Sequence, residues 1–463
     1  MTTKTYLAID LKSFYASVEC VARGLDPLTA RLVVADATRT EKTICLAISP
    51  ALKSLGLSGR ARLFEVIKCF GKVKLRQETT YDQTGDEIIT HVATSKYNKG
   101  DFLIARPRMQ LYVDISQKIV SIYNQFVASE DIHIYSIDEV FIDITPYLDT
   151  YHMSPHELAK KMIREVYCQT GITATAGIGT NLYLAKIAMD ILAKHQPPDE
   201  DDVRIAELDE YTYRKTLWGH RSLADFWRIG NGISRRLQHL GIYTMGDLAR
   251  YSLTGSDNLY SEFGVNAELL IDHAWGYEPV EMLDIKSYRS NNHSISSGQV
   301  LARPYDFTET LTIVNEMANA LALKLLDKRI LTDQLILTLV GEKHALTHGS
   351  IRLGDFTNSS DIILQYASKL YHQIASPQDK FRRIYIVATH IIPSYKIKTQ
   401  PKQLDLFTDY EKTESELARH ARRDEAILKI QHRYGKNALL RGFNFEPGAT
   451  MKKRNQEIGG HRA

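Results

Sequence analysis

The amino-acid sequence predicts a multidomain α+β protein with a split β-α-β-β-α-β unit near its N-terminus. Its 463 residues exceed what one hydrophobic core usually serves, so we expect about three to five domains. Segments with strand and helix periodicity follow one another in the order that the split unit requires. A long stretch, from Leu11 to about Leu103, is then an insertion between the first strand and the first helix of this unit.

The first half of the unit is predicted from three segments. The apolar run Tyr6-Leu7-Ala8-Ile9 forms the first strand. Two short strands, at 132–135 and 140–144, come after the first helix. That helix, at 108–126, has an apolar face at helical spacing, formed by Leu111, Ile115, Ile119 and Ile122.

The second half begins with a helix at 155–167, whose early proline is tolerated in a first helical turn. A β-branched strand at 172–178 and a further helix at 182–194 complete the unit. In the split arrangement the first and third strands are neighbours at the centre of the sheet. We therefore expect the first strand to lie beside the strand at 140–144.

Acidic residues lie where these two strands meet. Asp10 ends the first strand, and the pair Asp138-Glu139 occupies the turn before the third. Adjacent acids that face another acid repel one another unless cations lie between them. Two divalent ions held in this way are the apparatus of in-line phosphoryl transfer.

Composition excludes several classes of protein. The cysteines show no paired CxxC spacing, which favours buried thiols in a reducing cytoplasm over a metal or disulfide framework. No apolar run approaches membrane-spanning length, so we expect no membrane contact. The first residues lead straight into a strand, so we expect no signal peptide and a cytoplasmic location. The four cysteines are Cys20, Cys45, Cys69 and Cys168.

Charge is distributed unevenly, although the formal net charge is only +3. Residues 285–400 carry 14 Lys and Arg against 9 Asp and Glu, whereas residues 205–283 carry 7 against 11. Ordinary surface variation is the alternative explanation for a difference of this size. A basic module beside an acidic one otherwise indicates that contact with a polyanion is localised.

Three motifs carry a resemblance to a known family. They are Asp10-Leu11-Lys12-Ser13-Phe14-Tyr15-Ala16-Ser17-Val18-Glu19, Tyr135-Ser136-Ile137-Asp138-Glu139 and Gly177-Ile178-Gly179-Thr180-Asn181-Leu182-Tyr183-Leu184-Ala185-Lys186. In this order and separation they resemble the motifs of the Y-family translesion DNA polymerases, most closely the UmuC-like branch of bacteria, plasmids and phages. The resemblance covers most of the chain. It implies a right-hand polymerase with a ferredoxin-like palm, small fingers, a helical helix-hairpin-helix thumb and an α/β little finger.

The resemblance also implies domain boundaries. The little finger would be a second split module that tracks the DNA backbone without reading bases. Its expected helices lie near 308–328 and 360–374, and its strand-like runs lie at 335–340 and 383–387. The expected domains are the palm at 1–12 and 103–202, the fingers at 13–102, the thumb at 203–283, the little finger at 284–397 and a C-terminal tail at 398–463.

Asp10, Asp138 and Glu139 match the catalytic, metal-binding carboxylates of the family. The backbone carbonyl of Leu11 matches its further metal ligand. The resemblance implies two Mg²⁺ ions at these oxygens, which are hard ligands of the kind that magnesium takes. One ion would activate the primer 3′-hydroxyl, and the other would neutralise charge on the triphosphate and the leaving pyrophosphate.

Tyr15 matches the steric gate of the family, a ring placed against the sugar so that a ribose 2′-hydroxyl would clash. Phe14, which precedes it in the substrate-binding motif, is expected to pack inward. An aromatic pair at a helix start usually belongs to a core. The motif favours the gate for Tyr15 alone.

Two lysines match positions that hold the dNTP triphosphate in the family. Lys53 matches the basic position of the fingers motif, and the tyrosine that many relatives carry three residues earlier is Pro50 here. Lys194 resembles the palm lysine but lies one residue later, counted from Lys186, than in better-known relatives. The alternative is that each lysine is a solvated surface charge.

Residues 226–237, followed by Leu240-Gly241-Ile242, resemble a helix-hairpin-helix that binds primer-template DNA. Gly230 and Gly232 would free backbone N–H groups for a DNA phosphate, beside the N-terminus of the next helix. A simple turn between helices is the alternative.

The segment 401–407 closely resembles the peptide that binds the bacterial sliding clamp (beta). The alternative is a strand edge that packs on its own domain. A basic helix at about 415–434 and the run Met451-Lys452-Lys453-Arg454 follow, and we expect this tail to be a solvated or partner-bound extension. Accessory proteins of the SOS response are a further class of partner that the resemblance implies. The expected clamp-binding residues are Gln403, Leu404, Asp405, Leu406 and Phe407.

The resemblance therefore implies a low-fidelity, template-directed DNA polymerase for translesion synthesis, recruited by the clamp. A nucleotidyl cyclase shares the palm fold, but the tyrosine gate, the hairpin and the clamp peptide argue against it. The non-enzyme alternative is a clamp-bound accessory protein that has lost its acids. The presence of all three acids disfavours it.

Overall fold

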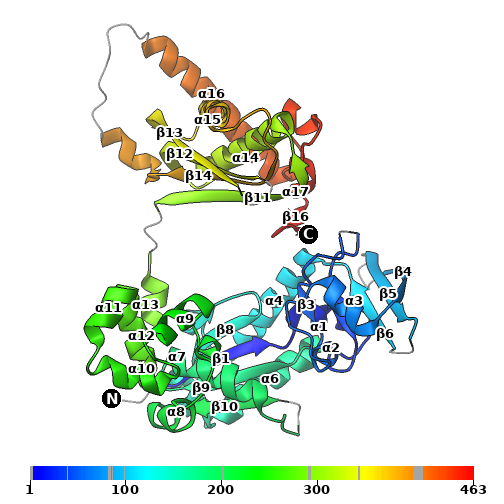
Figure 1. The fold of residues 1–463 in the computed structure, drawn as a ribbon, viewed down its shortest axis with the longest axis vertical. Helices are drawn as coiled ribbons and strands as arrows, with labels where there is room; N and C mark the ends of the chain where they lie inside the picture. Colours follow the sequence, from blue (N-terminus) through cyan, green and yellow to red (C-terminus); the bar gives the residue numbers. More distant parts are fainter. Residues whose placement is uncertain are drawn as a thin grey trace. The chain divides into compact units, whose positions relative to one another are not determined.

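The structure is a computed structural model that describes residues 4–38, 40–81, 85, 87–97, 100–200, 203–289, 293–341, 345–399 and 410–462. The chain divides into two compact units, an N-terminal unit from Met1 to Tyr288 and a C-terminal unit from Arg289 to Arg462 (Figure 1). Each unit combines helices with a mainly antiparallel sheet, so the predicted α+β class is confirmed. Within the described residues we find no helix whose length and hydropathy would let it span a bilayer.

The palm sheet of the N-terminal unit has the strand order β10-β9-β1-β8-β7. β1 lies between β8 and β9 and is antiparallel to both, which confirms the predicted pairing of the first and third strands. The sheet continues past the expected palm boundary at residue 202, because β10 pairs in parallel with β9. The strands are β1 (Tyr6–Leu11), β7 (Ile132–Ile134), β8 (Glu139–Asp143), β9 (Ala174–Gly179) and β10 (Arg204–Leu208).

Helices pack against both faces of this sheet. Successive strand residues point to opposite faces. Leu11 and Val140 face α4, whereas Ala8 and Phe141 pack with Leu182 of α7. α6 begins with a capping box and has proline in its first turn, as its sequence predicts. The helical elements here are α4 (Met109–Tyr123), η1 (Ser129–Asp131), α5 (Thr145–Tyr151), α6 (Pro155–Thr170) and α7 (Leu182–Ile187).

The insertion between β1 and α4 folds into a second sheet, in the order β3-β2-β6-β5-β4. β6 crosses the expected boundary between fingers and palm and pairs with β2 and β5, so it belongs to this fingers sheet. The elements are α1 (Phe14–Val21), β2 (Leu32–Val34), β3 (Ala47–Ile48), α2 (Pro50–Lys53), α3 (Leu63–Phe70), β4 (Val73–Tyr81), β5 (Glu87–Ser95) and β6 (Asp101–Ala105).

A helical thumb region completes the N-terminal unit. Its core, which includes Phe226, Leu237 and Leu270, is continuous with Tyr183 and Leu184 of α7. The thumb region therefore packs directly on α7, which lies between strands β9 and β10 of the palm sheet. Its elements are α8 (Glu210–Leu217), η4 (Leu223–Asp225), α9 (Asn231–His239), α10 (Met245–Ser252), α11 (Ser256–Phe263), α12 (Asn266–Trp275) and α13 (Met282–Ser287).

The C-terminal unit is built on a sheet in the order β11-β14-β12-β13, with β15 paired to β12. Two long helices share a buried core with this sheet, and the predicted helices and strand runs of this region are confirmed. The elements are β11 (Ser294–Tyr305), α14 (Phe307–Asp327), β12 (Ile330–Gly341), β13 (Leu346–Thr357), α15 (Ser360–Ile374), β14 (Phe381–Thr389), β15 (Ile392–Pro393) and η6 (Ser394–Thr399).

The expectation that the tail is a solvated or partner-bound extension is wrong for its described residues. The predicted basic helix is present, but this segment packs against α14 and α15. Periodicity could not show this, because the attachment depends on single buried acids rather than on a long apolar stripe. The elements are α16 (Tyr410–Tyr434), η7 (Gly442–Phe445), α17 (Met451–Arg454), β16 (Glu457–Ile458) and β17 (His461–Arg462).

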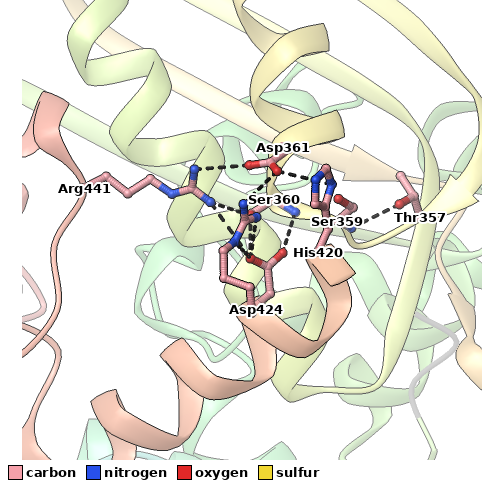
Figure 2. A network of polar contacts seen from close by, with 8 residues as sticks. Thr357, Ser359, Ser360, Asp361, His420, Asp424 and Arg441 are labelled. Atoms are coloured by element: carbon pink, nitrogen blue, oxygen red, sulfur yellow. Dashed lines mark hydrogen bonds and ion pairs between the residues drawn. The ribbon is translucent and has the colours of Figure 1, made fainter. Parts of the chain in front are cut away.

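The first of these acids is Asp424 of α16, which lies at the N-terminus of α15 (Figure 2). Its carboxylate is 2% exposed and accepts from the Ser360 backbone N–H over 3.0 Å and from the Ser360 hydroxyl over 2.8 Å. Asp361 accepts from Arg423 and Arg441 at 2.9 and 3.2 Å. Asp424 therefore caps a helix that is more than 60 residues away in the sequence.

The second acid is Glu316 of α14, which is 1% exposed. Its carboxylate accepts from the Asn444 side chain over 2.9 Å, from the Thr450 N–H over 2.9 Å and from the Met451 N–H over 3.0 Å. Buried carboxylates are tolerated only where donors replace water. Glu316 and Asp424 thus join the tail to the little finger at two separate points.

Candidate active site

The acidic turn is held beside the end of β1. Asp10 pairs in register with Glu139 across β1 and β8. The Leu11 N–H donates to the Asp138 carbonyl over 2.8 Å, and the Ser136 hydroxyl donates to the Asp138 carboxylate over 2.7 Å. Strand pairing and the closed turn therefore bring together the three acids that the sequence singles out.

Two lysines from the segment after β9 form ion pairs with these acids. Lys186 pairs with Glu139 and with Asp190, the latter at 2.9 Å. Lys194 pairs with Asp10 and with Asp190, the latter at 2.8 Å. Asp190 thus bridges two ammonium groups, and each ammonium reaches one of the strand-end acids.

The lysine-bearing segment is not the single helix that the sequence pattern predicts. α7 passes into a π-helical turn, η2 (Ala188–Leu192), and then into a 3₁₀ turn, η3 (Ala193–His195). A π turn accommodates an extra residue in a helix and is frequent at functional sites. This π turn lies between Lys186 and Lys194, and the Lys194 ammonium that follows it pairs with Asp10.

Two glycines of the third motif let this segment lie close to the sheet. A Cβ at Gly177 would lie 2.1 Å from the Ala185 carbonyl oxygen, and a Cβ at Gly179 would lie 2.2 Å from the Ala185 nitrogen. Backbone therefore packs on backbone between β9 and α7. Any side chain at either glycine would push α7, and with it Lys186, away from the acids.

Burial and neighbouring charges shift the titration of the site. Burial raises the pKa of Asp10, an effect that Lys194 partly offsets. Burial likewise raises the pKa of Glu139, offset in part by Lys186. Burial alone would lower the pKa of Lys194, but Asp10 and Asp190 together raise it above its ordinary value. Burial therefore disfavours the charged forms of Asp10 and Glu139, and the lysine ammonium groups favour them.

Tyr15 lies in the first turn of α1, with its ring partly exposed. The ring stacks on that of Tyr112 from α4, with centroids 4.5 Å apart. Burial raises the pKa of Tyr15, and Asp138 is close enough to raise it further. Phe14 packs inward and is 2% exposed. The two ring centroids lie 5.7 Å apart, but Phe14 is buried whereas Tyr15 is partly exposed and lies near Asp138.

The network behind Tyr15 is not evident from the sequence. The Tyr112 hydroxyl donates to the Glu19 carboxylate over 2.7 Å. Glu19 is fully buried and also pairs with Arg108, at 3.1 Å, and with Arg23. Arg23 donates to Thr90 of the fingers sheet over 2.8 Å. The available signal was an acid inside the apolar helix of the first motif, which needs a buried partner.

Lys53 lies at the end of α2 and donates to the Ser13 hydroxyl over 2.9 Å. Burial lowers the pKa of Lys53, and Asp10 counteracts this, so the ammonium lies in the field of the acids. Pro50 is the first residue of α2, where its fixed φ suits a helix start. The position that is a tyrosine in many relatives therefore offers no phosphate donor.

The donor set is of the kind that binds a hard divalent cation. In the parts of the chain that the structure describes, no three acidic, histidine or cysteine side chains converge closely enough to form a ready-made metal site. Asp10 and Glu139 turn instead to Lys194 and Lys186. Because burial disfavours their charged forms, these carboxylates suit positively charged partners, whether ammonium groups or metal ions.

The glycines expected to bind a DNA phosphate lie where α9 begins. Gly230 is its N-cap, and Gly232 lies in its first turn. A Cβ at either position would meet no atom within 4 Å, so local packing leaves this surface open. The left-handed residue of the loop is Arg228, with φ 67°, rather than a glycine.

The expected clamp-binding residues, 403–407, lie outside the described residues. The chain is described on either side of them. η6 ends at Thr399 and α16 begins at Tyr410, and both belong to the C-terminal unit.

Comparison with protein families places this geometry in a known context. Residues 9–190 match the impB/mucB/samB family, and residues 292–406 match the C-terminal domain of the same family. The first match contains the acids of the candidate site together with Lys53 and Lys186, whereas Lys194 lies just beyond its end. The second ends before α16, so the folded tail lies outside it.

Individual proteins are similar over the full length. The chain is 28% identical to a Bacillus subtilis (strain 168) protein named for UV-damage repair, UvrX, with 99% of this chain and 98% of that protein aligned. It is 24% identical to DNA polymerase IV 2 of the same organism, over 100% and 99% of the two chains. The fold resembles a solved Y-family DNA polymerase chimera with a TM-score of 0.60 at 18% identity, covering 84% of this chain and 99% of that one. The two family matches together span well over half of the sequence, and the chain belongs to the impB/mucB/samB family, the UmuC-like branch of the Y-family DNA polymerases.

Proposed function

We propose that this polymerase is a low-fidelity, template-directed enzyme that transfers a nucleotide from a dNTP to a primer 3′-hydroxyl and copies damaged template in the cytoplasm. The observation that carries the proposal is the register of Asp10 with Glu139, beside Asp138, with lysines within reach. Carboxylates and ammonium groups in one site suit a reaction that moves a polyanionic triphosphate.

Asp10, Asp138 and Glu139, with the Leu11 carbonyl, would hold two Mg²⁺ ions. Bound there, the ions would neutralise charge on the triphosphate and make the primer hydroxyl a better nucleophile. The protein's own contribution is to keep the acids ionised and fixed in place. The strand register and the Ser136 hydrogen bond to Asp138 provide that rigidity.

Lys194, Lys186 and Lys53 would bind the triphosphate. Each ammonium has an oxygen partner in the structure: Asp10 for Lys194, Glu139 for Lys186 and Ser13 for Lys53. A phosphate oxygen is an acceptor of the same kind with more charge, so an incoming dNTP can replace these partners. The lysines thereby hold the site together before the nucleotide arrives.

Tyr15 would exclude ribonucleotides. Its ring is backed by Tyr112, which is fixed in turn by the buried Glu19. A ring supported from behind cannot retreat from a ribose 2′-hydroxyl without disturbing that network. This support makes Tyr15 suited to act as a gate rather than as a mobile surface ring.

DNA would be held through its phosphates by both units. The open surface at Gly230 and Gly232 admits a phosphate close to the N-terminus of α9. On the C-terminal unit, alternate residues of the sheet are exposed, including Arg352 and Arg383. Contacts of this kind give affinity without base specificity, as copying of damaged template requires.

Recruitment would use the segment 403–407, in which Gln403, Leu404 and Phe407 would enter the groove of the bacterial sliding clamp. Accessory proteins of the SOS response are further proposed partners. Replacing these three residues by alanine should spare synthesis on a short primer and remove stimulation by the clamp. Equal stimulation of the variant and the wild type would contradict this assignment.

Primer extension tests the proposal as a whole. The full chain, Mg²⁺, dNTPs and a primed template should give extension, and a template with a blocking lesion should be copied past the lesion. Failure to extend any primer would refute the proposed activity. Extension of undamaged template alone would remove translesion synthesis from the proposal.

A further inference from the structure

Trp227 joins the thumb region to the palm through side-chain contacts. It lies in the thumb loop, residues 226–230, which connects η4 to α9. Its indole N–H donates to the Tyr135 hydroxyl over 3.1 Å, and the two rings meet edge to face with centroids 5.9 Å apart. The ring also lies 6.0 Å from that of Phe141 on β8. Trp227 therefore packs against the cores of both regions.

On the palm side, Tyr135 is part of the acidic turn. Its N–H donates to the Glu139 carbonyl over 3.0 Å. The Lys186 ammonium, which pairs with Glu139, lies 5.8 Å from the centroid of the Tyr135 ring. The Tyr135 side chain is 44% exposed, so burial alone does not fix it. The hydrogen bond that its hydroxyl accepts from the Trp227 indole restrains the side chain further.

On the thumb side, the surroundings of Trp227 fix the loop that leads to Gly230. The ring stacks on that of His273, which is hydrogen-bonded to Glu278 at 3.0 Å. The guanidinium of Arg228 lies 5.0 Å from the ring centroid, while its backbone adopts φ 67°. Non-glycine residues rarely adopt this conformation, and it persists only where the surroundings impose it. A shift of Trp227 would release the loop.

We propose that Tyr135 and Trp227 are positioning residues that hold the thumb loop in a fixed position relative to the acidic turn. The inference rests on the proposed function, because it takes the surface at Gly230 to hold a phosphate of the primer-template. DNA held at the thumb loop must then present its primer end to Asp10. Misplacement by about 1 Å can lower the rate of such a reaction about a hundredfold.

Tyr135→Phe removes the hydrogen bond and keeps the ring, whereas Trp227→Phe removes the same hydrogen bond and replaces the indole with a smaller aromatic ring. Tyr135→Phe and Trp227→Phe should each lower the maximal rate of single-nucleotide insertion by about three- to tenfold at saturating DNA and dNTP. The dNTP concentration for half-maximal rate should stay within about twofold of the wild type, because the lysines are untouched. The double variant should be no slower than the slower single variant, because both changes break the same bond.

Trp218→Phe is the matched control. Trp218 donates its indole N–H to the Ala274 carbonyl over 2.8 Å, entirely within the thumb region. This variant should therefore keep the insertion rate of the wild type. An equal loss of rate in Trp218→Phe would show that the stability of the thumb region, rather than the position of the thumb loop relative to the acidic turn, is responsible. That result would overturn the proposal.

The remaining outcomes also test the positioning role of Tyr135 and Trp227. Unchanged insertion rates in Tyr135→Phe and Trp227→Phe, with active wild type, would overturn the positioning role alone. Losses that multiply in the double variant would overturn the shared bond. A wild-type chain that extends no primer would instead refute the proposed function, so the two failures are distinguishable.

Discussion

Both units contain buried acids, but the acids have different kinds of partner. In the C-terminal unit, Glu316 and Asp424 accept hydrogen bonds from backbone N–H groups of other elements. In the N-terminal unit, Asp10 and Glu139 face each other across two strands and pair with lysine ammonium groups. A backbone N–H cannot leave its acid without local unfolding, whereas a lysine side chain can change partner by rotation.

This difference separates the acids that join segments of the fold from the acids that we propose to hold metal ions. Glu316 and Asp424 accept from backbone N–H groups that the fold fixes, so they join segments. Asp10 and Glu139 are paired with lysine side chains that other cations or phosphates can displace. Burial is therefore a poor guide to function by itself, and the identity of the partner is a better one.

Asp138→Ala combined with Glu139→Ala is expected to give the largest effect. Loss of two of the proposed metal-binding carboxylates should lower primer extension by on the order of a thousandfold or more, whereas binding to duplex DNA should be nearly unchanged because the proposed phosphate contacts lie elsewhere. Extension assays would measure the rate of primer extension, and fluorescence anisotropy would measure binding to duplex DNA. Full extension by the double variant would show that these acids are structural, like Asp424.

Asp424→Ala should affect stability instead. It leaves the N-terminus of α15 without its cap and removes one of the two acids that Arg423 and Arg441 contact, which should lower the free energy of unfolding of the C-terminal unit by about 2–4 kcal/mol. Chemical denaturation would measure this. Glu425→Ala, the adjacent exposed acid on α16, is the control and should change stability little. Similar values for the two would mean that the tail is only loosely attached.

Much of the N-terminal unit could be predicted because its signals are local. The strand that ends at Asp10 and the turn at Asp138 are visible as apolar runs with acids at their ends, and pairing follows from the order of elements. The attachment of the tail could not be predicted. It depends on Glu316 meeting Thr450 across more than 130 residues, and no periodicity encodes such a pair.

The candidate site shows the same limit of prediction from the sequence. The motif spacing indicates the acids and Tyr15, but Asp190 and Tyr112 become visible only when the fold brings them to Lys194 and Tyr15. The π turn is a further case. The sequence pattern predicts one continuous helix at 182–194, whereas the backbone changes to a π turn and then a 3₁₀ turn before the Lys194 ammonium pairs with Asp10.

Tyr15→Ala extends the comparison to aromatic rings and should have an intermediate effect. Removing the ring should raise incorporation of ribonucleotides relative to deoxyribonucleotides by about tenfold to a hundredfold, the range over which a pocket rejects an added hydroxyl. Tyr15→Phe keeps the ring and should keep the selectivity. Paired rNTP and dNTP insertion rates measure the ratio. An unchanged ratio in a folded Tyr15→Ala variant would make Tyr15 an ordinary packing residue.

The smallest expected effects come from one cation of each cluster, Lys194 in the N-terminal unit and Arg441 in the C-terminal unit. Lys194→Ala should raise the KM for dNTP by about tenfold, because one charged contact to the triphosphate is lost, and should leave stability of the C-terminal unit unchanged. Arg441→Ala should do the opposite. It should keep the KM within about twofold of the wild type and lower the free energy of unfolding by about 1 kcal/mol, because Arg441 donates to Ser360 at 2.6 Å and to Asp361 at 3.2 Å. Steady-state kinetics would measure the KM for dNTP of both variants, and denaturation would measure their free energy of unfolding. If Lys194→Ala lost stability without a change in the KM for dNTP, the pairing of Lys194 with Asp10 would be structural. The distinction between mobile and fixed partners would then not hold for Asp10.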